Sequence, residues 1–198
     1  MAKLLARAEK LPEDTVQSQL AAIQDHLHTV AHETTTPCRH HGRTGTAAAG
    51  EGQAGAALDV LRGRPEVDPA KLGGIGFCFG GSTVLQLARG GVDLKGVVSF
   101  HGGLQTKAPA QAGSVKASVL CCTGADDPMI AADQVVAFEQ EMRAAGADWQ
   151  VVSYGNTVHS FTNPEADGSL NPAILYNEKT DRRSWAAMRG FFQERFGA

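Results

Sequence analysis

The segment Gly76-Phe77-Cys78-Phe79-Gly80 constrains the fold of this chain more than any other feature. It ends a short apolar run, Leu72–Phe77, that is typical of a buried strand, and it precedes Ser82–Arg89, whose pattern indicates a helix. A chain that turns directly from a strand into a helix needs small residues on either side of the turn. Such a turn, which we call the nucleophile elbow, holds the Cys78 side chain clear of the backbone at the carboxyl end of the strand.

Residues 56–198 continue this alternation of short apolar strands and helices. Further strands are expected at Leu94–Phe100, Ser118–Cys122 and Trp149–Tyr154, and further helices at Ala131–Ala145 and Asp181–Phe196. Alternation of this kind implies an α/β fold, with a mostly parallel sheet and helices on both of its faces.

Residues 1–55 have a different character, and we predict an atypical N-terminal segment there, followed by one α/β domain over residues 56–198. Leu4–Leu27 has apolar residues at helical spacing, whereas Thr34–Gly52 is rich in Thr, Gly, His and Ala and indicates loop or disorder. No part of Met1–Gly55 resembles a strand. The composition of Thr34–Gly52 suggests a truncated or frame-shifted start.

Charge and hydropathy exclude several classes of function. The net charge of −3 and the pI near 6.1 argue against a nucleic-acid partner. No apolar run is long enough to span a membrane, and the N-terminus lacks the apolar core of a signal peptide. We therefore expect a cytoplasmic protein without a membrane partner, whose four cysteines are thiols.

The position of Cys78 predicts two partner groups later in the chain. A helix N-terminus favours a thiolate, and a cysteine nucleophile needs a histidine to keep it ionised and a carboxylate to orient that histidine. In folds with such an elbow, the acid and then the histidine come later in the chain, each in a loop that follows a strand. Asp126 and Asp127 follow Ser118–Cys122, and His159 follows the next strand. The spacing leaves both aspartates open as the acid, and either one is also explained by a turn or a helix cap.

Three motifs in this order resemble those of the dienelactone hydrolase family, within the α/β-hydrolase superfamily. They are GFCFGG at Gly76–Gly81, GADDP at Gly124–Pro128 and VHSF at Val158–Phe161, and the resemblance extends from about Ala56 to the C-terminus.

The resemblance implies a carboxylic ester or lactone hydrolase of the carboxymethylenebutenolidase type, acting through a cysteine acyl-enzyme on a small-molecule substrate. It implies a catalytic triad of Cys78, Asp127 and His159, with Asp127 preferred over Asp126. It further implies that the backbone N–H of Phe79 is an oxyanion donor, and that no cofactor or metal is needed.

Two departures from the family pattern affect this interpretation. Family members have about four strands before the elbow, and these carry a second oxyanion donor and a glutamate that helps to activate the cysteine. Without them Leu72–Phe77 would be an exposed edge, to be covered by Met1–Leu27 or by a second subunit in a homo-oligomer. Also, Asn163 stands where some members have an arginine that binds a substrate carboxylate, which argues against a carboxylated dienelactone.

Two alternatives compete with an active hydrolase. The first is a non-catalytic, truncated hydrolase-like protein that serves as a binding or assembly module. The second is a thiol-redox or metal protein built on Cys38, Cys121 and Cys122. No cysteine and histidine spacing here matches a structural zinc site.

Overall fold

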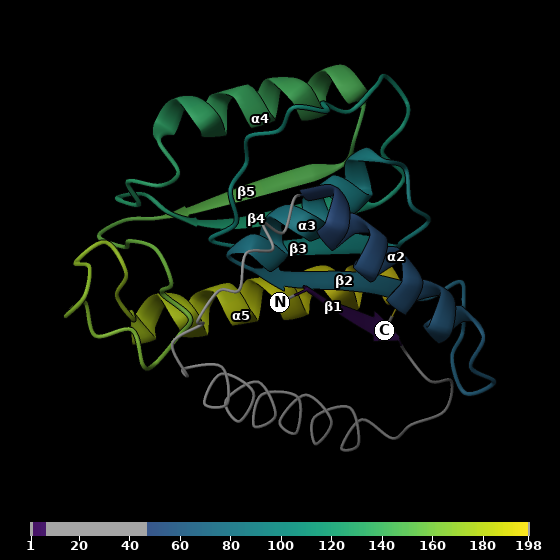
Figure 1. The fold of residues 1–198 in the computed structure, drawn as a ribbon, viewed down its shortest axis with the longest axis horizontal. Helices are drawn as coiled ribbons and strands as arrows, with labels where there is room; N and C mark the ends of the chain where they lie inside the picture. The colour runs from purple at the N-terminus through teal and green to yellow at the C-terminus, as the bar shows by residue number, and fades with distance from the viewer. Residues whose placement is uncertain (1, 7–46, 198) are drawn as a thin grey trace.

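The computed structural model of the protein describes residues 2–6 and 47–197 (Figure 1). Its strands are β1 (Ala2–Ala6), β2 (Leu72–Phe77), β3 (Gly96–Phe100), β4 (Ser118–Gly124) and β5 (Trp149–Tyr154). Its helices are α2 (Ala47–Arg62), α3 (Phe79–Arg89), α4 (Ala132–Ala145) and α5 (Glu178–Phe196). None of these helices is both long and apolar enough to cross a membrane.

The strands form one sheet in the order β1-β2-β3-β4-β5. Strands β2 to β5 run parallel, and β1 pairs antiparallel with β2. Helices follow or separate these parallel strands, so the predicted α/β fold with a mostly parallel sheet is confirmed. The loops that follow β2 to β5 therefore lie together at one end of the sheet, the carboxyl end, and the loops that lead into these strands lie at the other, the amino end.

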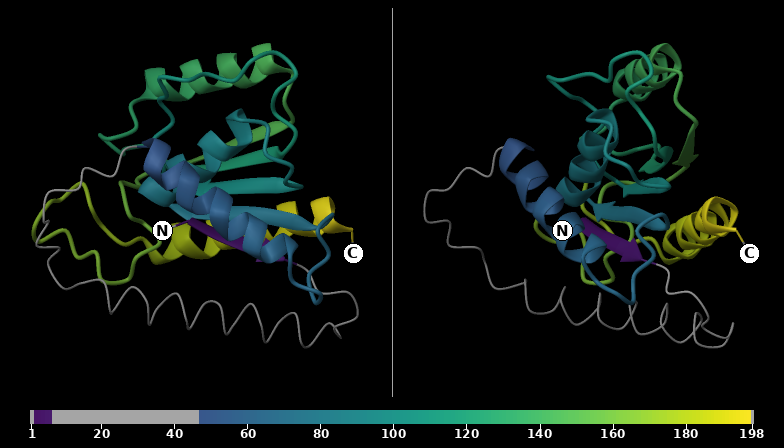
Figure 2. Two further views of the ribbon diagram at one scale, coloured as in Figure 1. Left: turned by 45° about the vertical axis from the view of Figure 1, so that its right-hand side comes forward. Right: turned by 90° about the vertical axis from the view of Figure 1, so that its right-hand side faces the viewer.

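Two apolar clusters cover the two faces of the sheet. Neighbouring strand residues point to opposite faces, so Val97 packs with α2, α3 and α4, while Val98 packs with α5. The right-hand view of Figure 2 shows α5 on one side of the sheet and α2 with α3 on the other. Burial on both faces explains why β3 and β4 have continuous apolar character instead of alternating.

The prediction that Met1–Gly55 contains no strand is wrong, because Ala2–Ala6 forms β1. This strand occupies the side of β2 that the sequence analysis expects to be an exposed edge, with Ala2 opposite Gly76 and Ala6 opposite Leu72. The edge on which a homo-oligomer is expected is thus already paired within the chain. Leu4 to Ala6 also lie in this strand and not in the expected helix, whose remainder lies outside the described residues.

Helix α2 begins at Ala47, inside the stretch expected to be loop or disorder, and it crosses the predicted boundary between residues 55 and 56. The described part of that stretch is therefore helical up to Gly52. The rest of it lies outside the described residues.

Candidate active site

The nucleophile elbow has the tight geometry that its glycines predict. Cys78 has a positive φ of 52° with ψ −119°, a conformation that residues with a β-carbon rarely adopt. Its backbone N–H donates to the Phe100 carbonyl at 3.0 Å, which fixes the turn against β3. A β-carbon added to Gly76 would lie 1.9 Å from the Gly80 carbonyl oxygen. Only glycine therefore fits at position 76, and the Cys78 side chain is left exposed at the carboxyl end of the sheet.

His159 is fixed by its own backbone before its ring makes any contact. The His159 N–H donates to the Ala173 carbonyl at 2.9 Å, and the His159 carbonyl accepts from the Leu175 N–H at 3.0 Å. These two bonds tie the loop after β5 to the segment that leads into α5. These bonds therefore fix the backbone position from which the His159 ring projects at the carboxyl end of the sheet.

Asp127 is the carboxylate that meets this histidine. It is only 3% exposed, and its Oδ2 lies 2.8 Å from His159 Nδ1. Its Oδ1 accepts from the Met129 N–H at 2.8 Å, so both carboxylate oxygens have a partner. Asp126, the other candidate acid, is exposed on the surface, and its N–H donates to the Thr157 carbonyl. The structure thus brings Asp127, and not Asp126, to His159.

The other ring nitrogen of His159 faces the cysteine. The distance from His159 Nε2 to Cys78 Sγ is 3.2 Å, within hydrogen-bond range for sulfur. Three side chains from the loops after β2, β4 and β5 therefore form one continuous chain of contacts: carboxylate, imidazole and thiol.

These contacts shift the proton from sulfur toward nitrogen. The hydrogen bond with His159 lowers the pKa of the Cys78 thiol; burial opposes this shift, and the His159 charge and the Phe79 backbone N–H reinforce it. Burial of the His159 ring disfavours its protonation, but the hydrogen bonds with Asp127 and Cys78 outweigh that and raise its pKa to about 9. Both shifts favour the thiolate form of Cys78 and the imidazolium form of His159 over the two neutral forms.

A buried histidine, His101, lies beside this site. His101 follows β3, is 3% exposed, and its ring centroid lies 4.9 Å from that of His159. Nothing in the local sequence distinguishes it from an ordinary loop residue, since its neighbours at the site come from a segment nearly sixty residues later.

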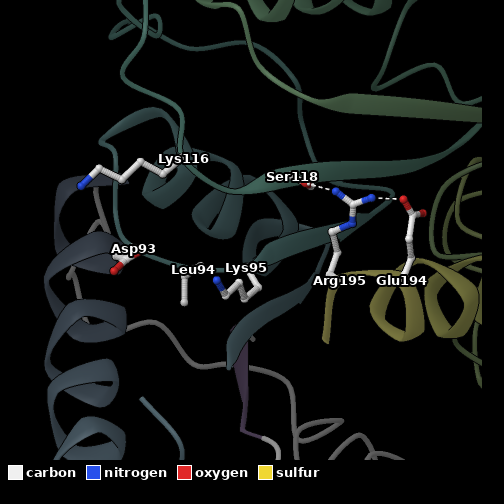
Figure 3. A pocket seen from close by; sticks show the side chains of 7 residues that line it. All are labelled: Asp93, Leu94, Lys95, Lys116, Ser118, Glu194 and Arg195. Atoms are coloured by element: carbon white, nitrogen blue, oxygen red, sulfur yellow. Dashed lines mark hydrogen bonds and ion pairs between the residues drawn. The ribbon is translucent and has the colours of Figure 1, made fainter. Parts of the chain in front are cut away.

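A cleft of about 450 Å³ lies elsewhere, at the amino end of the sheet (Figure 3). Residues at the strand starts and at the end of α5 line it, most of them charged: Asp93, Leu94, Lys95, Lys116, Ser118, Glu194 and Arg195. Arg195 bonds with Ser118, Asp148 and Glu194, so most of its charge is satisfied within the fold. This cleft is separated from the Cys78 site by the length of the strands.

The two adjacent cysteines of β4 belong to the core. Cys121 and Cys122 are each 1% exposed, and burial raises the pKa of both thiols, that of Cys122 to about 12. Among the described residues, no cluster of His, Cys, Asp and Glu is placed to hold a metal ion. Cys38, which the redox and metal alternative requires, lies outside the described residues.

Known proteins resemble this chain in sequence and in fold. The model of the dienelactone hydrolase family matches residues 16–196. An uncharacterized protein of Caenorhabditis elegans is 37% identical over 146 residues, covering 71% of this chain and 90% of that protein. The crystal structure of a dienelactone hydrolase-like promiscuous phosphotriesterase from metagenomic libraries is 46% identical, with a TM-score of 0.72, covering 77% of this chain and 64% of that one.

The fold and the strand–turn–helix site define an α/β hydrolase-type protein. More particularly, the chain belongs to the dienelactone hydrolase family. A Yersinia pestis protein named "Putative carboxymethylenebutenolidase" is 27% identical over 135 residues, which cover 64% of this chain and 48% of that protein. The chain thus spans about half the length of that relative and 64% of the solved phosphotriesterase structure.

Proposed function

We propose that this protein hydrolyses a small carboxylic ester or lactone, with Cys78 as the nucleophile, His159 as general acid and base, and Asp127 as the group that orients His159. The observation that carries the proposal is the unbroken contact chain from Asp127 Oδ2 through the His159 ring to Cys78 Sγ. The membership of the chain in the dienelactone hydrolase family supports it.

Acylation begins with the Cys78 thiolate. Its sulfur attacks the carbonyl carbon of the ester, a C–S bond forms, and the C=O π electrons move to the oxygen. When the tetrahedral intermediate collapses, the bond between that carbon and the leaving oxygen breaks, and His159 Nε2–H gives its proton to that oxygen. The products of this half-reaction are an alcohol and a thioester on Cys78; from a lactone, both remain in one molecule.

Deacylation uses the same residues in reverse. Neutral His159 takes a proton from a water molecule at Nε2, and the water oxygen attacks the thioester carbon. The C–S bond then breaks, which releases the carboxylic acid and restores the thiolate beside the imidazolium. Asp127 orients the ring and stabilises its positive charge.

The elbow itself supplies part of the oxyanion site. The backbone N–H of Phe79 already interacts with the Cys78 sulfur at the first turn of α3. A donor in this position also points to where the negative carbonyl oxygen of the intermediate develops.

The loop after His159 favours an uncharged acyl group. Asn163 stands where some members of the family carry an arginine, and its Oδ1 accepts from the Glu165 N–H at 3.1 Å, so the side chain is engaged in its own turn. It provides no positive charge for a substrate carboxylate. We therefore expect neutral esters and lactones to be better substrates than carboxylated dienelactones.

The decisive experiment is p-nitrophenyl acetate hydrolysis by the wild-type protein and by Cys78→Ala. Loss of turnover in Cys78→Ala, with turnover retained in a Cys38→Ala control, is the expected result. Equal background rates for wild type and Cys78→Ala, from protein shown to be folded by circular dichroism, would instead favour the non-catalytic binding module.

A further inference from the structure

The buried side chain of His101 is not accounted for by the reaction described above. It follows β3, which lies between the strands that carry Cys78 and Asp127. Its backbone N–H donates to the Cys122 carbonyl at 2.8 Å, while the preceding carbonyl, of Phe100, accepts from the Cys78 N–H. The backbone at His101 thus connects the nucleophile elbow to β4.

The conformation at this position is a costly one. His101 has a φ of 39°, in the left-handed region that residues with a β-carbon seldom occupy. Its Nδ1 is buried and has no hydrogen-bond partner among the residues that the structure describes. A side chain that served only to fill the core would need neither the strain nor the unpartnered nitrogen, and features of this kind concentrate at functional sites.

The His101 ring contacts the catalytic loop at more than one point. Its Nε2 and Thr162 Oγ1 share a hydrogen bond of 2.9 Å. Its ring lies edge-to-face with His159, at 64° between the planes, and with Phe161, at 83° and 5.0 Å between centroids. The loop of His159 to Thr162 is therefore held against the end of β3 by one side chain.

The ring adds no charge to the site. Burial and, to a smaller extent, the nearby His159 charge lower the pKa of His101 to about 3. His101 is neutral at any working pH, so it packs against the His159 imidazolium without repelling it. A protonated residue here would favour loss of the His159 proton.

We infer that His101 is a positioning residue, whose ring and hydrogen bond with Thr162 hold the His159 imidazole in line with Cys78 Sγ. The effect of His101 on catalysis rests on the proposed function, because it presupposes that Cys78 and His159 hydrolyse an ester or lactone. The orientation of the Cys78–His159 pair is nevertheless measurable without turnover, because that pairing sets how readily the thiol ionises.

The test is the pH dependence of Cys78 alkylation by iodoacetamide, followed at the Cys78 peptide by mass spectrometry. His101→Asn removes the ring but tolerates the left-handed backbone, and Thr162→Val removes only the hydroxyl. In both variants the midpoint of alkylation should move to higher pH, by about one unit in His101→Asn, because Cys78 loses a well-placed partner. Thr162→Ser keeps the hydroxyl and should keep the wild-type midpoint.

Ester turnover gives the second readout. For His101→Asn, kcat should fall ~10- to 100-fold with little change in KM, since a misplaced imidazole slows the chemistry and leaves the binding of substrate intact. Unchanged alkylation midpoints and unchanged kcat in folded His101→Asn and Thr162→Val would overturn the inference. If the wild type proves inactive on esters, the proposed function fails, but a shifted alkylation midpoint would still support the role of His101.

Discussion

The two ends of the parallel sheet are built differently, although the same strands connect them. At the amino end, glycine occupies the positive-φ positions of the described turns, at Gly91, Gly113 and Gly146. At the carboxyl end, four residues with a β-carbon adopt a positive φ: Cys78, His101, Asn156 and Ser160. Glycine adopts such angles at almost no steric cost, whereas the other residues do so only when the surrounding structure enforces them. Within residues 2–6 and 47–197, positive φ angles at residues with a β-carbon are thus confined to the end that carries the candidate site.

The charges follow the same division. The amino end carries exposed groups such as Lys95 and Lys116, and its ion pair between Arg195 and Asp148 is open to water. The carboxyl end carries the buried pair of Asp127 and His159. Water and salt screen the exposed pair of Arg195 and Asp148, whereas the buried pair of Asp127 and His159 is screened much less. Substitutions of similar chemistry should therefore have very different effects at the two ends.

The largest effect is expected from Asp127→Asn. The amide cannot stabilise the imidazolium and favours the wrong ring tautomer, so kcat/KM should fall by about 10³- to 10⁴-fold. Asp126→Asn is the matched control one residue away and should stay within about two-fold of wild type, because Asp126 is exposed and its side chain does not meet His159. Similar losses in the two variants, measured by initial rates of ester hydrolysis, would contradict the assignment of Asp127.

The next effect concerns stability. Gly76→Ala would force a β-carbon against the Gly80 carbonyl and should lower the free energy of unfolding by about 3 kcal/mol or more. Gly113→Ala at the amino end has a φ of 72° but open space around it, so about 1 kcal/mol is expected there. Urea unfolding curves measure both changes. Equal losses in the two variants would contradict the idea that the close contact with the Gly80 carbonyl is what requires glycine at position 76.

The pH profile gives a smaller, graded effect. The thiolate–imidazolium pair forms as pH rises through the lowered pKa of Cys78 and is lost as pH rises through the His159 pKa of about 9. For an alkyl ester or lactone, kcat/KM should therefore rise on the acid side, level off, and fall about tenfold per pH unit well above 9.

A p-nitrophenyl ester is the control for this profile, because its leaving group departs without a proton. Its alkaline decline should be weaker than that of the alkyl ester. An alkyl ester whose rate keeps rising above pH 10, after correction for hydroxide-driven hydrolysis, would rule out His159 as the proton donor.

The smallest effect is expected at the amino end, from Arg195→Gln. The substitution removes the 2.8 Å ion pair with Asp148 and the contact with Ser118, but this region is partly open to solvent. We expect a loss of up to about 1 kcal/mol in the free energy of unfolding and unchanged kcat/KM. A tenfold loss of activity in this variant would show that the two ends are coupled.

Local sequence was sufficient for the parts of the site that depend on local geometry. The elbow could be predicted because its glycines, its strand and its helix are contiguous in sequence. The partners of Cys78 could be predicted because chain order fixes which loops meet at the carboxyl end. Spacing left Asp126 and Asp127 open, since adjacent residues in a loop differ only in which way each side chain points.

Features that depend on distant partners could not be predicted in this way. Ala-Lys-Leu-Leu-Ala at Ala2–Ala6 is rich in helix-favouring residues, and it is a strand because it pairs with β2. His101 is similar, because its strain and its contacts with His159 and Thr162 arise only once β3 and the loop after β5 have come together.

The antiparallel direction of β1 has a practical consequence for anyone who handles this protein. Ala2 lies opposite Gly76, next to the nucleophile elbow, whereas α5 ends near Arg195 at the far end of the sheet (Figure 1). A purification tag or fusion partner joined ahead of Ala2 would emerge beside Cys78, where it could obstruct a substrate. One joined after Gly197 would emerge at the opposite end, so assays and immobilisation are best designed around a C-terminal attachment.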